Sequence, residues 1–356
     1  MTPVAVESSN TTERTGLSLS LEGVTTYLRF GRELKSVISR VDLRIEPGEI
    51  VGLVGESGSG KSMTARTIAG VLPRGAVTEG ALLLGGENLL DMPRRRRRDV
   101  QAKEIGVIFQ DPRAYIDPLW RVEVHMTEAM RVHLGLSRSE ARARAIELLD
   151  SVGIDQPERR MRQFPDELSG GMLQRVMIAG ALAVGPSVLL ADEATTALDV
   201  TTQAEIVKLL GDLSSRRGLS VLFITHDLAL ADLVCSRVCV MYAGRIVEMR
   251  EGRQIFENPM HPYTIDLLAA RPTIQHRVER LPVIKGVPTS AMDAPSGCPF
   301  HPRCRFVLDA CREAVPALMP VRGGLVRCFR ANEELRAQSG SPKGTLPDGE
   351  DDALES

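Results

Sequence analysis

The sequence lacks several features that would assign it to a particular class of protein. It contains no uninterrupted apolar run of the roughly 18 residues that a membrane span needs. Its net charge is -2, so no strong field favours nucleic acid as a partner. The first sixteen residues are polar and show no apolar segment of the kind found in signal peptides. Six cysteines are too few for a disulfide scaffold in a chain of 356 residues.

The composition that is present indicates a folded core with polar ends. Hydrophobic residues make up 43% of the chain, and its length suggests about two domains. Residues 1–16 and about 337–356 are rich in Ser, Thr, Gly, Asp and Glu, which predicts disorder at both ends. Prolines and cysteines become frequent beyond about residue 260, so we place a domain boundary there.

Short apolar runs alternate with segments of helical periodicity. The runs expected to form buried strands are 49–55, 105–110, 187–192 and 220–225. The clearest expected helices are 139–152 and 202–216. This alternation predicts an α/β core around a mainly parallel sheet. Residues 238–250 instead predict an antiparallel hairpin that turns near Ala243 and Gly244.

The most specific motif is a phosphate-binding loop. Residues 55–62 read GESGSGKS and fit G-x-x-x-x-G-K-[ST] between an apolar run and a helical segment. Such a loop points backbone N–H groups at phosphate oxygens, whereas a glycine-rich turn without a ligand is the weaker alternative. Lys61 is expected to reach the β- and γ-phosphates and Ser62 to help hold Mg²⁺. The residues predicted to contact the nucleotide here are Gly55, Glu56, Ser57, Gly58, Ser59, Gly60, Lys61, Ser62 and Met63.

Polar residues follow three other apolar runs. Asp192 and Glu193 end "VLLADE", Gln110 ends the run in "FQDP", and His226 follows the run in "ITHD". Because α/β sheets bind ligands at the carboxyl ends of strands, these residues are expected near the phosphate loop. Asp192 is predicted to organise the Mg²⁺ shell, and Glu193 to orient or deprotonate the attacking water. A solvated loop or purely structural roles are the alternative interpretation.

Six motifs in this order resemble the ATP-binding subunit of ABC transporters. They are "GESGSGKS", "FQDP", "LSGGMLQR", "VLLADE", "TALD" and "ITHD", and the resemblance covers about residues 17–260. "LSGGM" is the most diagnostic, because other phosphate-loop NTPases lack it. The resemblance implies a phosphate-loop, RecA-like α/β ATPase core with an antiparallel β subdomain and a helical subdomain at about 112–185. It implies ATP and Mg²⁺ as ligands, with Mg²⁺ near Ser62, Gln110 and Asp192.

The resemblance also assigns the second glycine-rich stretch to a neighbouring subunit. Ser169, Gly170 and Gly171 would bind the γ-phosphate of an ATP that is held by a partner, in a head-to-tail dimer with two ATP molecules at its interface. Ser169 is also expected to cap the helix that follows it. Asp199 would belong to the loop where the two subunits touch.

Roles in hydrolysis follow from the same resemblance. Gln110 would sense Mg²⁺ and the membrane subunits, and His226 would contact the γ-phosphate. The predicted catalytic residues are therefore Glu193, His226, Gln110 and Lys61. One departure is Ala194, which stands where the family usually has proline, and we expect a less rigid loop there.

Two sequence features have no assigned ligand. The adenine-stacking aromatic of the family lies upstream of the phosphate loop, and Tyr27 and Phe30 are both candidates, although each could be a core residue. Five consecutive arginines, Arg94–Arg98, suggest a nucleic-acid or lipid patch. A solvated helix or loop is the preferred interpretation, since the net charge does not support such a patch.

Four cysteines near the end of the chain form a second signature. They are Cys298, Cys304, Cys311 and Cys328, spaced C-x5-C-x6-C-x16-C, and "HPYT" precedes them at 261–264. Disulfides are disfavoured because an ATPase core is cytosolic and reduced. Structural zinc is an alternative, although the tight C-x2-C pairs typical of zinc sites are absent. A [4Fe–4S] cluster needs four thiolates and tolerates varied spacing, and unligated thiols are the remaining possibility.

A narrower resemblance bears on these cysteines. "HPYT" followed by this set is similar to the C-terminal extension of the peptide/nickel importer ATPases, here about 261–336. That family implies a [4Fe–4S] cluster on the four cysteines, with zinc kept as an alternative. Cys235 and Cys239 lie in apolar surroundings and are expected to be ordinary core residues.

The sequence therefore predicts an ATPase subunit that powers an importer of peptides or a related small solute. Its expected place is the cytoplasmic face of a membrane, paired with a second ATPase, identical or paralogous. Two permease subunits would dock on the helical segment, and a solute-binding protein would take part indirectly. No nucleic acid is expected. The rival hypotheses are a soluble ABC-type ATPase without a transport role and a redox or metal sensor that binds ATP.

Overall fold

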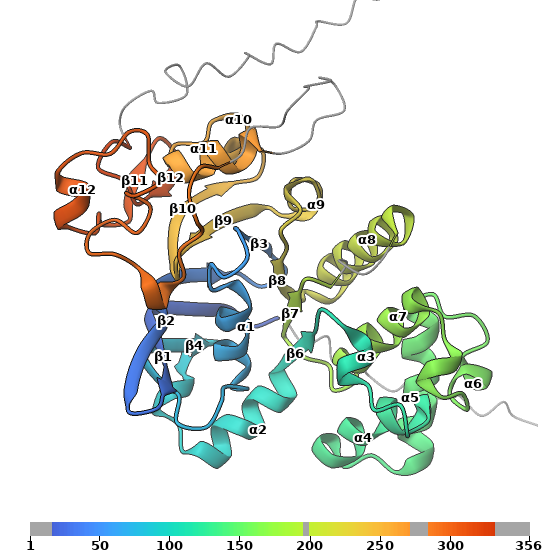
Figure 1. Ribbon diagram of the computed structural model, residues 1–356. Helices are drawn as coiled ribbons and strands as arrows, with labels where there is room; N and C mark the ends of the chain where they lie inside the picture. The colour runs from blue at the N-terminus through green and yellow to red at the C-terminus, as the bar shows by residue number, and fades with distance from the viewer. Residues whose placement is uncertain (1–15, 195–198, 271–283, 332–356) are drawn as a thin grey trace, which may run out of the picture.

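A computed structural model of the protein describes residues 16–194, 199–270 and 284–331 (Figure 1). The two ends that are predicted to be disordered lie outside these ranges, apart from residue 16. Within the described ranges, no helix is long and apolar enough to cross a membrane.

The described strands form two sheets, ordered β11-β12-β10-β9-β3-β8-β7-β6 and β2-β1-β4-β5. Their bounds are β1 (Leu19–Phe30), β2 (Glu33–Ile45), β3 (Ile50–Val54), β4 (Val77–Leu84), β5 (Glu87–Asn88), β6 (Ile105–Ile108), β7 (Val188–Asp192), β8 (Ser220–Ile224), β9 (Arg237–Tyr242), β10 (Arg245–Glu251), β11 (Met319–Val321) and β12 (Gly324–Val326).

The described helices are mostly short. Their bounds are α1 (Lys61–Ala69), α2 (Arg94–Glu104), α3 (Pro112–Tyr115), α4 (Val122–Leu134), α5 (Arg138–Ser151), α6 (Pro157–Arg160), α7 (Gly170–Ala181), α8 (Val200–Arg217), α9 (Leu228–Val234), α10 (Gln254–Glu257), α11 (Pro262–Ala269) and α12 (Ala310–Glu313), with 3-10 turns η1 (Leu89–Asp91), η2 (Pro165–Glu167) and η3 (Ala291–Asp293).

Five neighbouring strands of the larger sheet, β9, β3, β8, β7 and β6, run parallel to one another. β3 pairs with β8, β8 with β7 and β7 with β6. Every residue of β3, β7 and β8 is buried, as expected for strands covered on both faces. The four predicted strands and the mainly parallel sheet are confirmed. The strands begin or end one or two residues inside the predicted runs, so Gln110 and His226 stand just beyond the strand ends.

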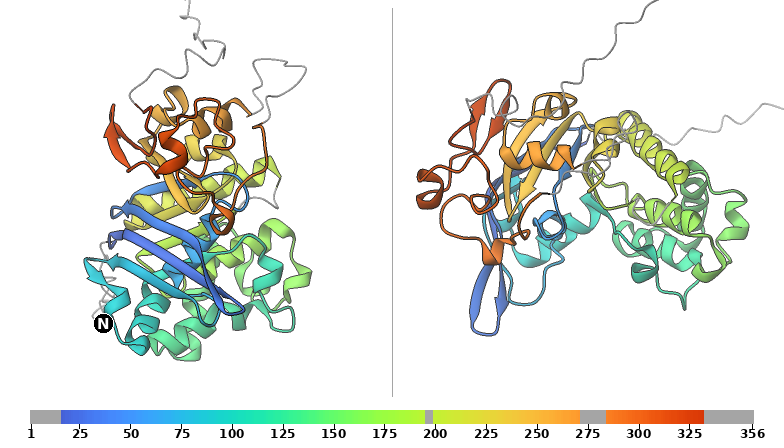
Figure 2. Two further views of the ribbon diagram at one scale, coloured as in Figure 1. Left: turned by 60° about the vertical axis from the view of Figure 1, so that its left-hand side comes forward. Right: turned by 45° about the horizontal axis from the view of Figure 1, so that its top comes forward.

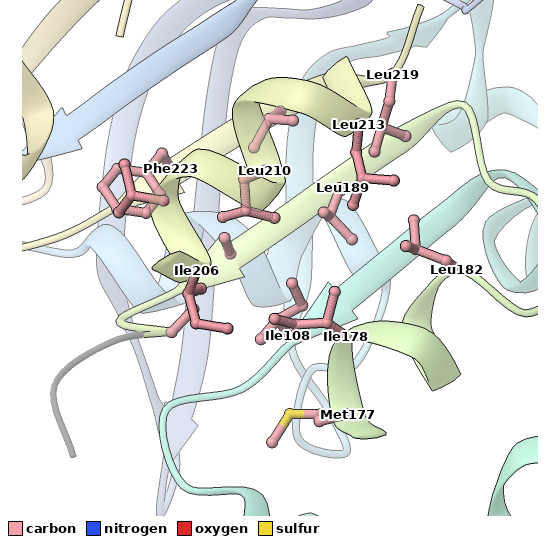
Figure 3. Close-up of a cluster of buried hydrophobic side chains, with 14 of the residues drawn as sticks. Ile108, Met177, Ile178, Leu182, Leu189, Ile206, Leu210, Leu213, Leu219 and Phe223 are labelled. Carbon is pink, nitrogen blue, oxygen red and sulfur yellow. The ribbon is translucent and has the colours of Figure 1, made fainter. Parts of the chain in front are cut away.

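The central sheet is buried beneath helices on one face. Figure 3 shows Ile108, Leu189 and Phe223, from β6, β7 and β8, packed in one cluster with side chains of α7 and α8. Both predicted helices are confirmed as α5 and α8. Ser137 and Glu140 form a capping box at the start of α5, which satisfies two backbone N–H groups there.

The remaining elements lie on either side of this core. Helices α3 to α7 lie at the end opposite the C-terminal extension, in all three views (Figures 1 and 2). The smaller antiparallel sheet packs through Leu19, Leu21 and Ile38 against a separate apolar cluster that includes Val51 and Ile68. The arginine run starts α2 and is mostly exposed, as a solvated helix would be.

The C-terminal extension continues the larger sheet. The predicted hairpin is confirmed as β9 and β10, which turn at Ala243 and Gly244. β12 then pairs with β10, and β11 pairs with β12. The Arg327 backbone and side chain donate hydrogen bonds to Val247 O (2.8 Å) and Ile246 O (2.9 Å). The domain boundary near 260 stays a prediction, although the sheet runs through it without a break.

Candidate functional site

A pocket of about 380 Å³ opens where the central parallel strands end. The phosphate loop follows β3, Asp192 ends β7, and Gln110 and His226 follow β6 and β8. Because these strands are neighbours and parallel, their carboxyl ends meet at one edge. The pocket is lined by Val37, Ser57, Gly58, Gly60, Lys61, Ser62, Met63, Gln110, Glu193, Ser290, Ala291 and Met292.

The phosphate loop has the tight conformation that its glycines allow. Gly55 has φ 150° and Gly60, the N-cap of α1, has φ 108°. A Cβ added at Gly55 would lie 2.2 Å from the carbonyl oxygen of Met241. Any side chain there would therefore push the loop away from the strand that supports it. The loop leads directly into α1, whose N-terminus can face an anion.

Lys61 is folded back on its own loop. Its Nζ donates hydrogen bonds to the carbonyl oxygens of Gly55 (2.9 Å) and Glu56 (3.0 Å). Burial lowers the pKa of Lys61, and the nearby carboxylates of Glu193, Asp192 and Glu56 oppose that shift. The Lys61 ammonium group can exchange these carbonyl oxygens for the oxygens of a phosphate that enters the loop.

Ser62 and Asp192 form a pair of oxygen groups at the start of α1. The Ser62 hydroxyl donates to Asp192 Oδ1 at 2.9 Å. Burial raises the pKa of Asp192, and the hydrogen bond from Ser62 opposes part of this rise. Hydroxyl and carboxylate oxygens side by side are ligands that suit Mg²⁺.

Glu193 stands at a strained backbone position directly after β7. Its φ is 49°, a value that non-glycine residues rarely adopt and that concentrates at functional sites. Its backbone N–H donates to Ile224 O at 2.9 Å, which ties the position to β8. Gln110 Nε2 donates to Glu193 Oε2 at 2.8 Å, and His226 Nδ1 lies 3.6 Å from Glu193 Oε1. The structure therefore brings three of the four predicted catalytic residues into direct contact around one carboxylate.

Ser169, Gly170 and Gly171 are not among the described residues that line this pocket. Ser169 caps α7 as expected, accepting a hydrogen bond from Met172 N at 3.3 Å. A Cβ added at Gly170 would have nothing within 4 Å, so the backbone there is open to an approaching group. A start of α7 that is open and separate from the chain's own pocket is compatible with a ligand held by another subunit.

Asp199 caps α8. It accepts hydrogen bonds from Thr202 N (3.0 Å) and Thr202 Oγ1 (2.8 Å), and these bonds lower its pKa. The rest of "TALD" lies outside the described residues. Ala194 is 2% exposed, so a small side chain fills the place where the family has proline.

Several pocket residues were not predicted from the sequence. Val37 of β2 and residues 290–292, in and beside η3, line the cavity, whereas Tyr27 and Phe30 do not. Phe30 is 46% exposed at the end of β1. No motif marks residues 290–292, because they reach the pocket only through the folding of the C-terminal extension.

The four C-terminal cysteines line a second, much smaller cavity of about 10 Å³. Its other walls are mainly aromatic rings and prolines. The Cys298 N–H donates to Cys311 O at 2.8 Å, which holds two of the cysteine segments together. All six cysteines of the chain are free, and Cys235 and Cys239 are buried core residues as predicted.

The thiols of this cavity lie close enough to influence one another's pKa values. Burial, together with the other cysteines of the set, raises the pKa of Cys304 to about 11 and that of Cys328 to about 12. Backbone N–H groups oppose these shifts, among them Arg330 N, which donates to Cys328 Sγ at 3.4 Å. In the described part of the chain, no three His, Cys, Asp or Glu side chains are arranged to hold a metal ion.

Contacts across the extension connect the two cavities through Glu56. Arg303, inside the "GCPFHPRC" segment, donates to both Glu56 oxygens at 2.7 and 3.1 Å, and its side chain is 3% exposed. The Glu56 backbone N–H donates to Tyr263 Oη at 2.7 Å. The Tyr263 and Tyr242 rings pack against Phe300, with centroids 5.4 and 5.3 Å away. The phosphate loop and the cysteine segment are thus held by the same residues.

A buried carboxylate anchors "HPYT". Glu248 on β10 accepts hydrogen bonds from the Met260 and His261 N–H groups, both at 2.9 Å. His261 Nδ1 in turn accepts from Tyr263 N at 3.1 Å and caps α11. Because His261 is fully buried, its pKa is lowered to about 3 and the ring is neutral.

Two family models match the chain, one described as ABC transporter over residues 38–196 and one as oligopeptide/dipeptide transporter, C-terminal region, over 247–311. The chain is 43% identical to a probable peptide ABC transporter ATP-binding protein of Sinorhizobium fredii, across 89% of this chain and 96% of that protein. It is 43% identical to the dipeptide transport ATP-binding protein DppD of Escherichia coli, across 81% and 88%. The solved ATP-binding cassette MJ0796, in a dimeric post-hydrolysis state bound to ADP and Pi, matches with a TM-score of 0.59 and 30% identity, across 66% of this chain and 99% of that one.

Proposed function

The chain belongs to the ABC transporter family and carries that family's oligopeptide/dipeptide C-terminal region, and we propose that it hydrolyses ATP to power an importer of peptides or a related small solute. The observation that carries this function is the pocket at the ends of β3, β8, β7 and β6. Similarity over most of the chain to peptide transport proteins supports the importer over a soluble ATPase or a sensor.

The proposed chemistry assigns one task to each group. The loop N–H groups and Lys61 hold the β- and γ-phosphates, since phosphoryl transfer depends mainly on positioning and charge stabilisation. Glu193 takes a proton from water while the water oxygen bonds to the γ-phosphorus. The bond from that phosphorus to the bridging oxygen breaks, and ADP leaves. Gln110 and His226, both beside Glu193, orient the carboxylate and the γ-phosphate.

Mg²⁺ fits the oxygen groups beside the loop. Ser62 and Asp192 already lie within hydrogen-bonding distance of each other, and Gln110 reaches the same pocket. These residues would hold the ion, which neutralises charge on the β- and γ-phosphate oxygens when it is bound.

A second subunit is proposed to complete the site. The helix that starts after Ser169 is separate from the chain's own pocket, and Gly170 leaves its backbone open. Such a helix N-terminus favours an anion brought by a partner. ATP bound between two subunits then adds charge-assisted hydrogen bonds that exist only while the pair is closed.

The proposed location is the cytoplasmic face of the membrane, with two permease subunits and, indirectly, a solute-binding protein. The surface between α3 and α4 supports a docking role for the helical segment. Tyr115 is 47% exposed, Leu119 81% and Trp120 57%, which places large apolar side chains together on the outside. Neighbouring exposed apolar residues of this kind mark interaction surfaces.

The cysteine cavity is proposed to hold a [4Fe–4S] cluster on Cys298, Cys304, Cys311 and Cys328. The donor chemistry fits, since four cysteines line one cavity and iron–sulfur clusters are held by four cysteine thiolates. Backbone N–H groups near the sulfurs are a further feature of such ligands. Anaerobically purified protein should carry iron and labile sulfide, roughly four of each per chain, and zinc in their place would overturn this assignment.

Reconstitution tests the proposed function directly. The chain should copurify with membranes and two permease proteins, and proteoliposomes that contain the assembly should take up peptides with Mg²⁺ and ATP. Lys61→Ala should abolish both uptake and phosphate release. A wild-type chain that hydrolyses ATP but never associates with a membrane protein would favour the soluble ATPase instead.

A further inference from the structure

One wall of the nucleotide pocket is apolar and comes partly from the C-terminal extension. Val37 of β2 lies on this wall with Ala291 and Met292 of η3. Val37 is 8% exposed, whereas Met292 is 40% exposed, so the methionine side chain has a face open to the cavity side. In Figure 1, this orange segment descends from the extension onto the blue β2 strand.

η3 packs closely against the hairpin turn at Gly244. The Gly244 N–H donates to Ser59 O of the phosphate loop at 2.7 Å, and Gly244 O accepts from Ser39 N of β2 at 2.8 Å. A Cβ added at Gly244 would lie 2.6 Å from the Ala291 Cβ. The phosphate loop, β2 and η3 therefore meet at one turn.

The turn that carries Met292 is also closed by its own side chains. Ser290 Oγ donates to Asp293 Oδ2 at 2.7 Å, across the residues of η3. This bond holds Ala291 and Met292 between two anchored ends. Met292 is thus presented to the pocket by a fixed turn rather than by a free chain segment.

The polarity of the pocket decides which part of a nucleotide meets this wall. Lys61 and Ser62 take the phosphates, and Gln110 and Glu193 face the bond that is cleaved. A purine base is flat and aromatic, and apolar side chains at the pocket come from Met63 at the start of α1 and from Val37, Ala291 and Met292 on this wall. Thioether sulfur makes favourable contacts with aromatic rings.

We propose that Met292, supplied by the C-terminal extension, packs with Val37 against the base of the bound nucleotide and sets part of its affinity. This inference rests on the proposed ATPase function. It gives the extension a direct part in nucleotide binding, in a pocket that Tyr27 and Phe30 do not line. Because the contact is apolar, it recognises a purine ring rather than one particular purine.

The test compares ATP with inorganic triphosphate, which shares the phosphates and lacks the base. In the full-length chain, Met292→Ala should weaken ATP and GTP binding about three- to tenfold by calorimetry. Affinity for triphosphate should stay unchanged, since Lys61 and the loop are untouched. Met292→Leu should restore most of the ATP affinity. Met319→Ala is the matched control, since Met319 is 49% exposed in the same extension and does not line the pocket.

The outcomes separate this inference from the function on which it rests. Unchanged ATP affinity in Met292→Ala, with ATP bound normally by wild type, would overturn the base contact alone. An equal loss of ATP and triphosphate affinity would also overturn it, because the damage would then lie in the phosphate loop. A wild-type chain that binds no ATP at all would instead remove the proposed function.

Discussion

The two cavities of this protein are built in opposite ways. The nucleotide pocket has a volume of about 380 Å³ and lies at the ends of strands that are hydrogen-bonded neighbours in one sheet. The cysteine cavity has a volume of about 10 Å³ and is enclosed by loops and by residues of two short helices, α11 and α12. In the first, polar groups from different elements pair, as Ser62 of α1 does with Asp192 at the end of β7. In the second, four cysteine thiols lie together, and their thiolate forms would repel one another.

This difference indicates which cavity depends on a bound ligand for its stability. The sheet can hold the nucleotide pocket in shape by its own backbone hydrogen bonds. The cysteine segment has little regular structure of its own and rests on Arg303, Tyr263 and Phe300 against the phosphate loop. A ligand on the four thiols would therefore stabilise the extension, whereas a nucleotide would mainly change what the pocket can do.

The largest expected effect concerns chemistry in the nucleotide pocket alone. Glu193→Gln should lower the rate of phosphate release by a hundredfold or more, because a general base contributes about 10²–10⁴ to the rate. ATP affinity should be retained, and the closed pair should accumulate. Phosphate release from the assembled complex and ATP binding measured in parallel check this. Normal turnover would remove Glu193 from its assigned role.

The next effect concerns the bridge between the cavities. Arg303→Ala should lower the free energy of unfolding by about 2–3 kcal/mol, since it leaves a partly buried Glu56 without its bidentate partner. Urea denaturation measures this. Arg305→Ala is the matched control, because Arg305 is 45% exposed in its pair with Asp266 and should cost about 0–1 kcal/mol. Equal losses for both variants would contradict a special role for the bridge.

A smaller effect depends on pH and concerns the anchor of the extension. The His261 pKa is lowered to about 3 by burial, so below pH 6.5 the unfolded chain binds a proton that the folded chain refuses. Stability should therefore fall as the pH drops, by about 2 kcal/mol at pH 5 from this group.

His261→Asn keeps an acceptor at the helix cap and removes this titration, so it serves as the reference. Burial raises the pKa of Glu248, which contributes with the opposite sign. The difference in the free energy of unfolding between wild type and His261→Asn isolates the contribution of the histidine, provided that Glu248 titrates alike in both proteins. Parallel stability curves between pH 7 and pH 5 would show that His261 does not carry the loss.

The sequence predicts the polar part of the nucleotide pocket well, because each of these groups ends a local pattern. The apolar run before Gly55 and the run before Asp192 both define a strand and place the next residue at its end. Pairing of Gln110 with Glu193 then follows from the sheet order, which a pattern of alternating strands and helices only suggests.

Contacts between distant segments were beyond prediction. Val37 and Met292 reach one pocket although 255 positions separate them by their numbers, and no spacing in the sequence relates them. The bridge between Arg303 and Glu56 is of the same kind. The cysteine spacing predicted a shared site and the fold does gather the four thiols, but side-chain positions that would hold a metal are not seen among the described residues.

The central claim is that a nucleotide held by one subunit is completed by Ser169 and Gly170 of another. The most direct measurement is a structure of the assembled transporter with Glu193→Gln, ATP and Mg²⁺, from which the distance between Ser169 and the nearest γ-phosphate is read. We predict hydrogen-bonding distance, about 3 Å, to the γ-phosphate of an ATP bound by the partner ATPase. A Ser169 remote from every triphosphate in that closed assembly would contradict the account.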